Sequence, residues 1–348
     1  MRATDRDAAL QPLLDRYGQR IEAELRRAFE GRDLVHYSLM RYHLGWEDRD
    51  GRPDEARHGK LLRPLLCVAS CESVGGDAEM AFPLATAVEL LHNFSLIHDD
   101  IEDRSPQRHG RDAVWKVWGI AQALNAGDGM FALAHVVLER LSRVGVDSQP
   151  VLAASRLLDR ASLRLCEGQY LDLAFEQRLD VSCADYLTMV SGKTAALMAA
   201  AAGSGALVGE APPGAVSAFE QFGEKLGFAF QIRDDVLGIW GESRDTGKPT
   251  GEDIRARKKS FPVVCAMESA TGRDREELRA IYGKERLNEK DVATASTLLE
   301  SAGARVRSQE TASGYAEEAL RCLAGIDLVP ERRRDLELLA DYFVNREA

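Results

Sequence analysis

Two stretches of the sequence place aspartates at the end of an apolar helical run, where paired carboxylates could bind divalent cations. The first stretch is LIHDDIED, residues 96–103, in which Asp99 and Asp103 stand four positions apart. On a helix this spacing puts both carboxylates on one face, about 6 Å apart along the axis. Hard oxygen ligands suit Mg²⁺, which keeps several waters and takes its other ligands from carboxylates and substrate phosphates. The alternative is a solvated acidic helix end, but such carboxylates face the negative end of the helix dipole unless cations are bound.

A second apolar run ends in the same way, at FQIRDDVLG, residues 230–238. Two helices that each bring aspartates to a C-terminal end repel one another unless cations lie between them. The two motifs together therefore predict a shared magnesium site. Its candidate metal ligands are Asp99, Asp100, Asp103, Asp234 and Asp235.

Basic residues that could receive a phosphate group follow helix ends or begin helices along the chain. A single lysine or arginine is most often a solvated surface charge. The placement of the whole set predicts instead that one bundle points these side chains toward one opening. The set comprises Lys60, Arg63, Arg108, Lys193, Lys248, Lys258 and Lys259.

The elements that must position these residues are helices. Prolines separate segments whose apolar residues recur at three and four positions, and strand patterns are nearly absent. Two polar stretches, 48–59 and 241–257, are interpreted as loops within one all-α domain that spans residues 1–348. The Ala-rich run 194–208 is expected to be a tightly packed helix. The expected helices span residues 7–30, 61–75, 78–103, 121–143, 148–176, 181–204, 213–238, 258–269, 287–302, 304–325 and 331–345.

Composition excludes several classes of function. With 45 Lys plus Arg against 56 Asp plus Glu, the formal charge is −11, which disfavours nucleic acid and anionic lipid as partners. The first residues lack the apolar core of a signal peptide, and no run of roughly 18 uninterrupted, strongly apolar residues is present. We therefore expect a cytoplasmic protein without stable membrane insertion. The six cysteines contain no C-x-x-C pair and are expected to be small buried side chains rather than zinc or disulfide sites.

In their order along the chain, these motifs resemble the trans-isoprenyl diphosphate synthases, the polyprenyl synthetase family. The resemblance is to its short-chain type, such as geranylgeranyl or farnesyl diphosphate synthases, and it covers about residues 59–262. The matching stretches are GKLLRP (59–64), His92, D-D-x-x-D (99–103), RHG (108–110), GQ (168–169), KT (193–194), FQIRDD (230–235), G-K-P-x-G-x-D (247–253) and K-x-S-x-P (258–262).

The resemblance implies a helical bundle around a central cavity, usually in a homodimer, and a prenyltransferase activity. Such an enzyme ionises an allylic diphosphate of C5–C15 with the help of Mg²⁺, adds isopentenyl diphosphate to the cation and removes a proton. Three Mg²⁺ would be held between the motifs, two by Asp99 and Asp103 and the third by Asp234. The other implied roles are as follows: Arg108, Lys193 and Lys248 for the allylic diphosphate; Lys60, Arg63 and His92 for isopentenyl diphosphate; Lys258 for substrate binding; Lys193, Thr194 and Gln231 beside the allylic cation.

Two positions depart from the family's pattern. Gly238 stands where the second motif usually has its last aspartate, and Glu242 is the nearest substitute along the helix. Activity is expected to survive, because the third ion depends chiefly on Asp234. His109 stands where the family commonly has an arginine assigned to isopentenyl diphosphate. Because an imidazole is charged only part of the time near neutral pH, binding of that substrate is expected to weaken as the pH rises.

Product length is expected to depend on the helix that carries Asp99. Phe94 lies about 7.5 Å down the axis from Asp99, and Ser95 is beside it. An aromatic ring there would block long products, although an aromatic in an apolar helix can equally be an ordinary core residue. Because Phe94 is the one aromatic at this floor and Ser95 leaves room, the sequence predicts a C15 or C20 product, with geranylgeranyl diphosphate (C20) favoured.

Three other functions remain as alternatives. A class I terpene synthase, which cyclises one prenyl diphosphate on the same fold, is favoured by the two departures. It is opposed by Lys60, Arg63 and His92, because a cyclase needs no second diphosphate site. A metal-dependent phosphohydrolase could use His98-Asp99, but the remaining histidines show no matching ligand pattern. A non-catalytic partner subunit would not need both acidic pairs and the lysines.

Overall fold

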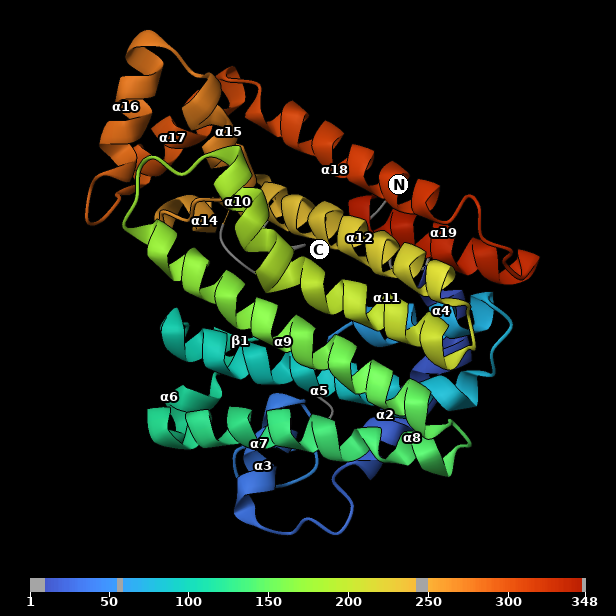
Figure 1. Ribbon diagram of the computed structural model, residues 1–348. Helices are drawn as coiled ribbons and strands as arrows, with labels where there is room; N and C mark the ends of the chain where they lie inside the picture. Colours follow the sequence, from blue (N-terminus) through green and yellow to red (C-terminus); the bar gives the residue numbers. More distant parts are fainter. Residues whose placement is uncertain (1–9, 55–58, 242–249, 346–348) are drawn as a thin grey trace.

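The computed structural model describes residues 10–54, 59–241 and 250–345, and this part of the chain is a bundle of helices (Figure 1). The N-terminal half contains η1 (Leu14–Gly18), α2 (Gln19–Arg27), α3 (Val35–His43), α4 (Leu62–Ser73), α5 (Ala78–Glu102), β1 (Gln107–Arg108), β2 (Arg111–Asp112), α6 (Val114–Trp118), α7 (Ile120–Leu138), α8 (Arg140–Arg143) and α9 (Ser148–Glu176). The C-terminal half contains α10 (Cys183–Val190), η2 (Ser191–Ala195), α11 (Ala196–Val208), α12 (Pro213–Trp240), α14 (Glu252–Arg255), α15 (Phe261–Ser269), α16 (Gly272–Tyr282), α17 (Glu289–Ser301), α18 (Ala304–Cys322) and α19 (Pro330–Asn345).

The all-α class predicted from the sequence is confirmed, and the long helices lie close to where periodicity placed them. The differences have local causes. Four helices were not expected: α3, α6, α14 and α16. Two of them are only four or five residues long, and α16 is so rich in charge that its buried side chains, Leu278, Ile281 and Tyr282, do not stand out. The helix expected over 181–204 is divided by η2, a short π-helix.

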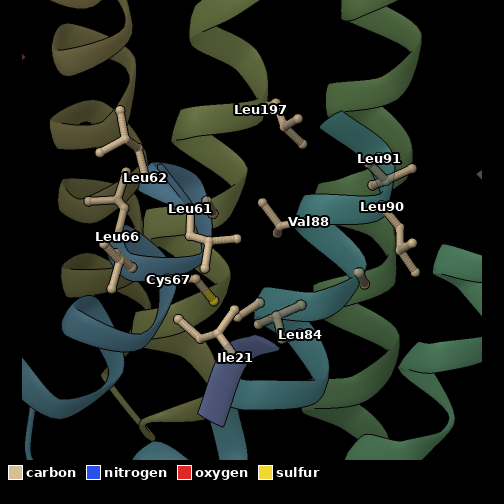
Figure 2. Close-up of a cluster of buried hydrophobic side chains, with 14 of the residues drawn as sticks. Ile21, Leu61, Leu62, Leu66, Cys67, Leu84, Val88, Leu90, Leu91 and Leu197 are labelled. Carbon is tan, nitrogen blue, oxygen red and sulfur yellow. The ribbon is translucent and has the colours of Figure 1, made fainter. Parts of the chain in front are cut away.

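The core is built around α5, against which α4, α7 and α11 pack. Figure 2 shows side chains from α2, α4, α5 and α11 gathered into one cluster, including Ile21, Cys67, Leu84, Val88 and Leu197. Each of these side chains is at most 2% exposed. Burial of a leucine or valine side chain stabilises the fold by about 1.5–3 kcal/mol, so this cluster fixes the positions of all four helices.

Glycines allow three helices to approach one another closely. A Cβ at Gly205 of α11 would overlap the backbone oxygen of Cys67 on α4, and a Cβ at Gly223 of α12 would overlap the backbone oxygen of Met198 on α11. The Ala-rich run that the sequence predicted to be tightly packed is α11, and nearly all of its residues are buried. The helix α11 therefore packs closely between α4 and α12, and it also contacts α5.

The helices α5 and α12 bring their C-terminal ends to the same end of the bundle. The segments that follow these ends are β1 and α6 after α5, and α14 after α12. They lie together at the left of Figure 1. The two aspartate motifs, which are about 135 positions apart in the sequence, therefore come to neighbouring places in the fold.

One described helix, α5, is long and apolar enough to cross a membrane by length and composition alone, which sequence inspection did not recognise. Of its most apolar window, 78% is buried inside the protein. Its C-terminal turn carries Asp99, which is partly exposed, and Asp100, which is buried. We therefore describe α5 as the core helix of the bundle.

Candidate active site

The first acidic motif forms the last turn and the C-cap of α5. Asp99 and Asp100 lie in that turn, and Asp103 caps the helix by donating its backbone N–H to the Asp99 carbonyl oxygen at 2.8 Å. The two adjacent side chains differ in environment, because that of Asp99 is 20% exposed whereas that of Asp100 is 1% exposed. Only the first aspartate of the pair is therefore turned toward solvent.

A short hairpin after α5 positions Arg108. His109 and Gly110 both have positive φ angles (52° and 78°), as the two central residues of a type I′ turn require, and they join β1 to β2. Arg108 donates from Nη2 to Asp100 Oδ1 at 2.6 Å and lies 3.5 Å from Asp99 Oδ2. Asp100 is thus held by a partly exposed guanidinium, which makes its role in the fold that of an anchor for Arg108.

The π-helix η2 and a glycine crossing place Lys193. A Cβ at Gly168 of α9 would overlap the backbone nitrogen of Lys193, and a Cβ at Gly192 would come within 3.0 Å of the Gly168 Cα. The wider π turn and this close crossing direct the Lys193 ammonium between two helices. Its Nζ lies 3.0 Å from Asp99 Oδ1 on α5 and 2.5 Å from Asp172 Oδ2 on α9. Asp172 was not predicted, although it lies one turn beyond the GQ motif at 168–169.

Charges in this cluster depend on one another. Burial alone would raise the pKa of Asp99, but Lys193 and Arg108 outweigh it and lower that pKa. Burial, together with the neighbouring Asp99, raises the pKa of Asp103 to about 6. Burial also opposes the charge of Lys193, yet Asp172 and Asp99 raise its pKa above the usual lysine value. The positive charges of Lys193 and Arg108 therefore offset the repulsion between the carboxylates of the first acidic motif.

The second acidic motif lies near the end of α12, and its two aspartates also differ. Asp235 is 6% exposed, and its Oδ2 accepts hydrogen bonds from the Tyr186 hydroxyl (2.6 Å) and the Phe261 backbone N–H (2.7 Å). Its Oδ1 accepts one from Gln231 Nε2 at 3.1 Å. Burial, followed by the nearby Asp253, raises the pKa of Asp235 to about 7. These contacts join α12 to α10 and α15, so Asp235 has a structural function that the sequence did not indicate.

Asp234 instead lines a cavity of about 340 Å³. The Thr194 hydroxyl donates to Gln231 Oε1 at 2.8 Å, and Gln231 also lines this cavity. Lys193 joins the two motifs, because it lines the same cavity and contacts Asp99. The lining residues are Asp172, Tyr186, Met189, Lys193, Gln231, Asp234, Asp235, Leu237, Gly238, Glu252, Asp253, Lys258, Lys259 and Ser260.

The carboxylate of Asp253 lies beside Gly238. Gly238 is the position at which the sequence lacks the last aspartate of the second motif. A Cβ at Gly238 would overlap the carboxylate of Asp253, which α14 carries. Burial opposes the charge of Lys258, but Asp253 and Asp103 raise its pKa. A carboxylate therefore reaches this part of the cavity from another element. The proposed substitute Glu242 and the predicted phosphate ligand Lys248 lie outside the described residues.

A second group of basic side chains surrounds the start of α4. Lys60 donates to the Tyr342 hydroxyl at 2.8 Å, and Arg63 Nη1 lies 3.2 Å from His92 Nε2. A guanidinium only donates, so His92 Nε2 must accept and the imidazole is neutral with its proton on Nδ1. Burial and the charges of Arg63 and Arg108 lower the pKa of His92 well below its usual value, which agrees with this tautomer.

His109, from the hairpin, faces this second group. It lines a small cavity together with Gly59, Asn93 and His43. His43 was not predicted, and no sequence motif marks it. Burial, with Arg108 and His109 nearby, lowers the pKa of His43 to about 3. Its Nε2 is buried and has no hydrogen-bond partner among the described residues.

The two residues expected to limit product length lie on α5, outside the lining of the main cavity. The Phe94 ring packs against Phe131 of α7, with ring centroids 5.1 Å apart, and against His98 at 5.8 Å. The Ser95 hydroxyl donates to the His92 carbonyl oxygen at 2.7 Å. The aromatic ring that was predicted to limit product length, Phe94, is thus packed against a second ring. That ring comes from α7, which the sequence analysis did not connect with Phe94.

The donor set fits Mg²⁺. Asp99, Asp103, Asp234 and Asp253 offer hard oxygen atoms near the cavity, and lysine and arginine hold part of that charge in the structure described. Within the described ranges, no group of three or more His, Cys, Asp or Glu side chains can hold a metal ion by itself. A Mg²⁺ ion typically takes one or two carboxylates and completes its shell with water and substrate phosphates.

Comparisons with known proteins agree with this geometry. Residues 55–299 match the sequence model of the family described as polyprenyl synthetase. The chain is 39% identical to a (2E,6E)-farnesyl diphosphate synthase of Mycobacterium tuberculosis, with 100% of both chains covered. It is 38% identical to a geranylgeranyl diphosphate synthase of the same organism, over 93% of this chain and 90% of the relative. It also resembles a polyprenyl synthase from Caulobacter crescentus CB15 crystallised with calcium and isoprenyl diphosphate, with a TM-score of 0.84, 30% identity and 98% of each chain covered.

The buried contacts of Asp235 predict a stability effect that does not depend on metal. Asp235→Ala should lower the free energy of unfolding by about 2–4 kcal/mol, because it leaves the Tyr186 hydroxyl and the Phe261 N–H buried without an acceptor. Asp235→Asn keeps one acceptor oxygen and should lose less than half as much. Urea unfolding without divalent ions measures both variants. Equal losses for the two would contradict the assigned hydrogen bonds.

Proposed function

The chain belongs to the polyprenyl synthetase family and is a prenyltransferase, and from that premise we propose that it joins isopentenyl diphosphate to an allylic diphosphate of C5–C15 to make a C15–C20 prenyl diphosphate. One observation carries the proposal. The Lys193 ammonium lies 3.0 Å from Asp99 and 2.5 Å from Asp172, and it lines one cavity with Asp234 and Lys258. Two acidic motifs and two lysines thus surround a space where an allylic substrate can lose its diphosphate group.

Loss of diphosphate from the allylic carbon is the demanding step, because it separates an anionic leaving group from a carbocation. Lys193, Arg108 and Lys258 supply fixed positive charge for that anion in a partly buried site, where electrostatic interactions exceed those in water. Lys248 is assigned to the same group by the family pattern. Magnesium, held by Asp99, Asp103 and Asp234 as three ions when substrate is present, would neutralise further charge on the leaving diphosphate.

Polar side chains then face the cation. The Thr194 hydroxyl donates to Gln231 Oε1, and Gln231 Nε2 donates to Asp235, so the amide is held by hydrogen bonds at both of its ends. This orientation is set before substrate binds. The amide and hydroxyl dipoles can stabilise positive charge without acting as nucleophiles, and reorganisation during the reaction is small.

The second substrate has its own basic site. Lys60, Arg63 and His109 are proposed to bind isopentenyl diphosphate, and His92 positions Arg63 as a neutral acceptor. The site would hold the double bond of isopentenyl diphosphate next to the cation, so the two reactants need not meet by diffusion. This positioning supplies much of the rate acceleration. The double bond attacks the allylic carbon, a new carbon–carbon bond forms, and the proton lost from the resulting cation passes to the released diphosphate.

We also propose a homodimer, in agreement with the family's usual assembly. Exposed apolar residues follow one stripe on α7 (Ile120, Leu124, Phe131) and one on the neighbouring α9 (Leu152, Leu163, Tyr170). The spacings of four, seven and eleven positions put each set on one helix face. Apolar surface of this kind is typical of a protein interface. Light scattering of the purified protein measures the assembly.

The assay that tests the function uses purified protein, Mg²⁺, radiolabelled isopentenyl diphosphate and each of the C5, C10 and C15 allylic primers. Label should enter a prenyl diphosphate, whose alcohol is identified after phosphatase treatment. Absence of incorporation, with consumption of a single prenyl diphosphate to a hydrocarbon, would favour the terpene synthase alternative. The Lys193→Ala variant is the control and should lose activity by roughly 100-fold or more, as expected for a group that stabilises transition-state charge.

Asp253 is predicted to perform the role of the missing aspartate at Gly238. Asp253→Ala should weaken Mg²⁺ binding by about ten-fold, or about 1.4 kcal/mol, in the presence of an unreactive allylic diphosphate analogue. The double variant Gly238→Asp/Asp253→Ala should recover much of that affinity, because the carboxylate then arises from α12 itself. Calorimetric titration of Mg²⁺ measures each protein. Glu252→Ala is the matched control in the same cavity, and an equal loss there would contradict a specific role for Asp253.

Histidine at position 109 predicts a pH-dependent substrate affinity. As the pH rises from about 6 to 8, the imidazole loses its proton, and the KM for isopentenyl diphosphate should rise by roughly five-fold, about 1 kcal/mol for loss of one charge-assisted hydrogen bond. His109→Arg retains its charge and should show a flatter profile. Initial rates with saturating allylic primer give both profiles. A pH-independent KM in the unsubstituted enzyme would refute the role of His109.

Phe94 is predicted to limit the product, with geranylgeranyl diphosphate as the specific proposal. Phe94→Ala should shift the products beyond C20, because the tail can then extend down α5 toward α7. Phe131→Ala should produce a smaller shift, and Ser95→Ala should leave the chain length unchanged. Chromatography of the dephosphorylated products measures the distribution. If the unsubstituted enzyme stops at C15, the C20 assignment is wrong and the paired rings of Phe94 and Phe131 give the structural reason.

A further inference from the structure

Two cysteines from distant parts of the sequence are in contact where α10 packs against α15. Cys183 is the first residue of α10, Cys265 lies within α15, and their sulfur atoms are 3.3 Å apart although 82 positions separate them. We infer that Cys183 and Cys265 form an oxidation site, at which a low-molecular-weight disulfide converts the two thiols into an intramolecular disulfide. The sequence had predicted six small buried thiols without disulfides.

The protein holds these two thiols in place from both sides. The Cys183 backbone N–H donates to Glu268 Oε1 of α15 at 2.7 Å, which fixes the start of α10 against α15. Cys265 is fully buried in a cluster with Val181, Tyr186 and Val264, and Cys183 packs against that cluster. A disulfide requires an S–S distance of about 2.0 Å, so the sulfurs must approach by about 1.3 Å.

Exposure determines the order of the chemical steps. Cys183 is partly exposed, whereas Cys265 is buried. A small disulfide, RSSR, therefore meets Cys183 first, and the Cys183 thiolate attacks one of its sulfurs to form a mixed disulfide and release RS⁻. Cys265 then attacks the Cys183 sulfur and releases the second RS⁻. Two thiols and RSSR give one protein disulfide and two RSH, so the protein pair loses two electrons and two protons and RSSR gains them.

Local electrostatics make the two thiols unequal. The hydrogen bond with Cys183 lowers the pKa of Cys265, whereas that hydrogen bond, burial and the Glu268 carboxylate raise the pKa of Cys183. Because one hydrogen bond joins the two sulfurs, transfer of its proton from Cys183 to a Cys265 thiolate places the thiolate on the partly exposed cysteine. Cys183 also lies at the N-terminus of α10, where the helix dipole favours an anion.

The other cysteines provide internal comparisons. Cys67 and Cys71 are buried in α4, and Cys166 is exposed on α9. Among the described residues, only Cys183 and Cys265 have their sulfurs in contact. An exposed thiol without a neighbouring thiol retains a mixed disulfide, whereas a partnered thiol resolves it. A thiol that retains the mixed disulfide and a thiol that resolves it can therefore be compared within one molecule.

The cross-link would join elements that carry active-site residues. The helix α10 continues into η2, which carries Lys193, and α15 begins just after Lys258, Lys259 and Ser260. A disulfide between the two would fix these walls of the cavity relative to one another. It would also close a loop of more than 80 residues, which reduces the freedom of the unfolded chain and raises the melting temperature.

The test incubates the folded protein with oxidised glutathione, alkylates the remaining thiols and maps non-reduced peptides by mass spectrometry. We expect a linked Cys183–Cys265 peptide pair that is two hydrogens lighter, glutathione retained on Cys166, and unmodified Cys67 and Cys71. The melting temperature should rise on oxidation and return with a dithiol reductant. Glutathione retained on Cys183, or a pair that stays reduced while Cys166 reacts, would overturn the inference.

Two variants separate the steps. In Cys265→Ser, Cys183 should retain glutathione because nothing resolves the mixed disulfide, and oxidation should no longer raise the melting temperature. In Cys183→Ser, Cys265 should remain unmodified because it is buried. If either variant fails to fold, the peptide map of the unsubstituted protein still decides. None of these measurements requires prenyltransferase activity, so the result is independent of the proposed function.

Discussion

Mutual repulsion among carboxylates at two helix ends is the constraint on which the rest of this structure depends. The helix α5 carries aspartates in its last turn, where the helix dipole disfavours negative charge, and α12 carries Asp234 and Asp235 about one and a half turns before its end at Trp240. Such an arrangement is stable only if positive charge lies between the ends. In the structure described, Lys193 and Arg108 supply it at the first motif, and each is itself placed by an unusual local conformation: a π turn for Lys193 and a type I′ hairpin for Arg108. The proposed binding of substrate and metal would use the same electrostatic arrangement.

The two aspartates of each pair differ in burial and in the groups that they contact. Asp99 and Asp234 face outward to Lys193 or to the cavity, whereas Asp100 and Asp235 are buried and accept hydrogen bonds from the protein. Because consecutive residues on a helix point about 100° apart, one aspartate of a pair can face the reaction while the other holds neighbouring elements. Each motif therefore joins neighbouring elements through one aspartate, and its other aspartate is the proposed metal ligand.

The departure at Gly238 shows how the fold tolerates change. A glycine near the end of a helix costs about 1 kcal/mol relative to alanine, so its presence there requires a compensating contact. That contact is the carboxylate of Asp253, which occupies the space that a side chain at position 238 would take. A carboxylate therefore lies beside position 238, supplied by α14, and Asp253 is itself part of the G-K-P-x-G-x-D motif.

The sequence by itself determined the helical class, the approximate bounds of the long helices, and the residue types at both acidic motifs. It could do so because helical periodicity, proline positions and the four-residue spacing of Asp99 and Asp103 are local properties. It did not indicate Asp172, Tyr186, His43 or Phe131 as neighbours of the predicted residues, and it treated Asp100 and Asp235 like their exposed neighbours. It also gave no sign that Cys183 and Cys265 touch. Those facts were decided by tertiary structure, because they depend on close glycine crossings, on the π turn in η2 and on packing between helices more than 20 positions apart, which no local pattern encodes.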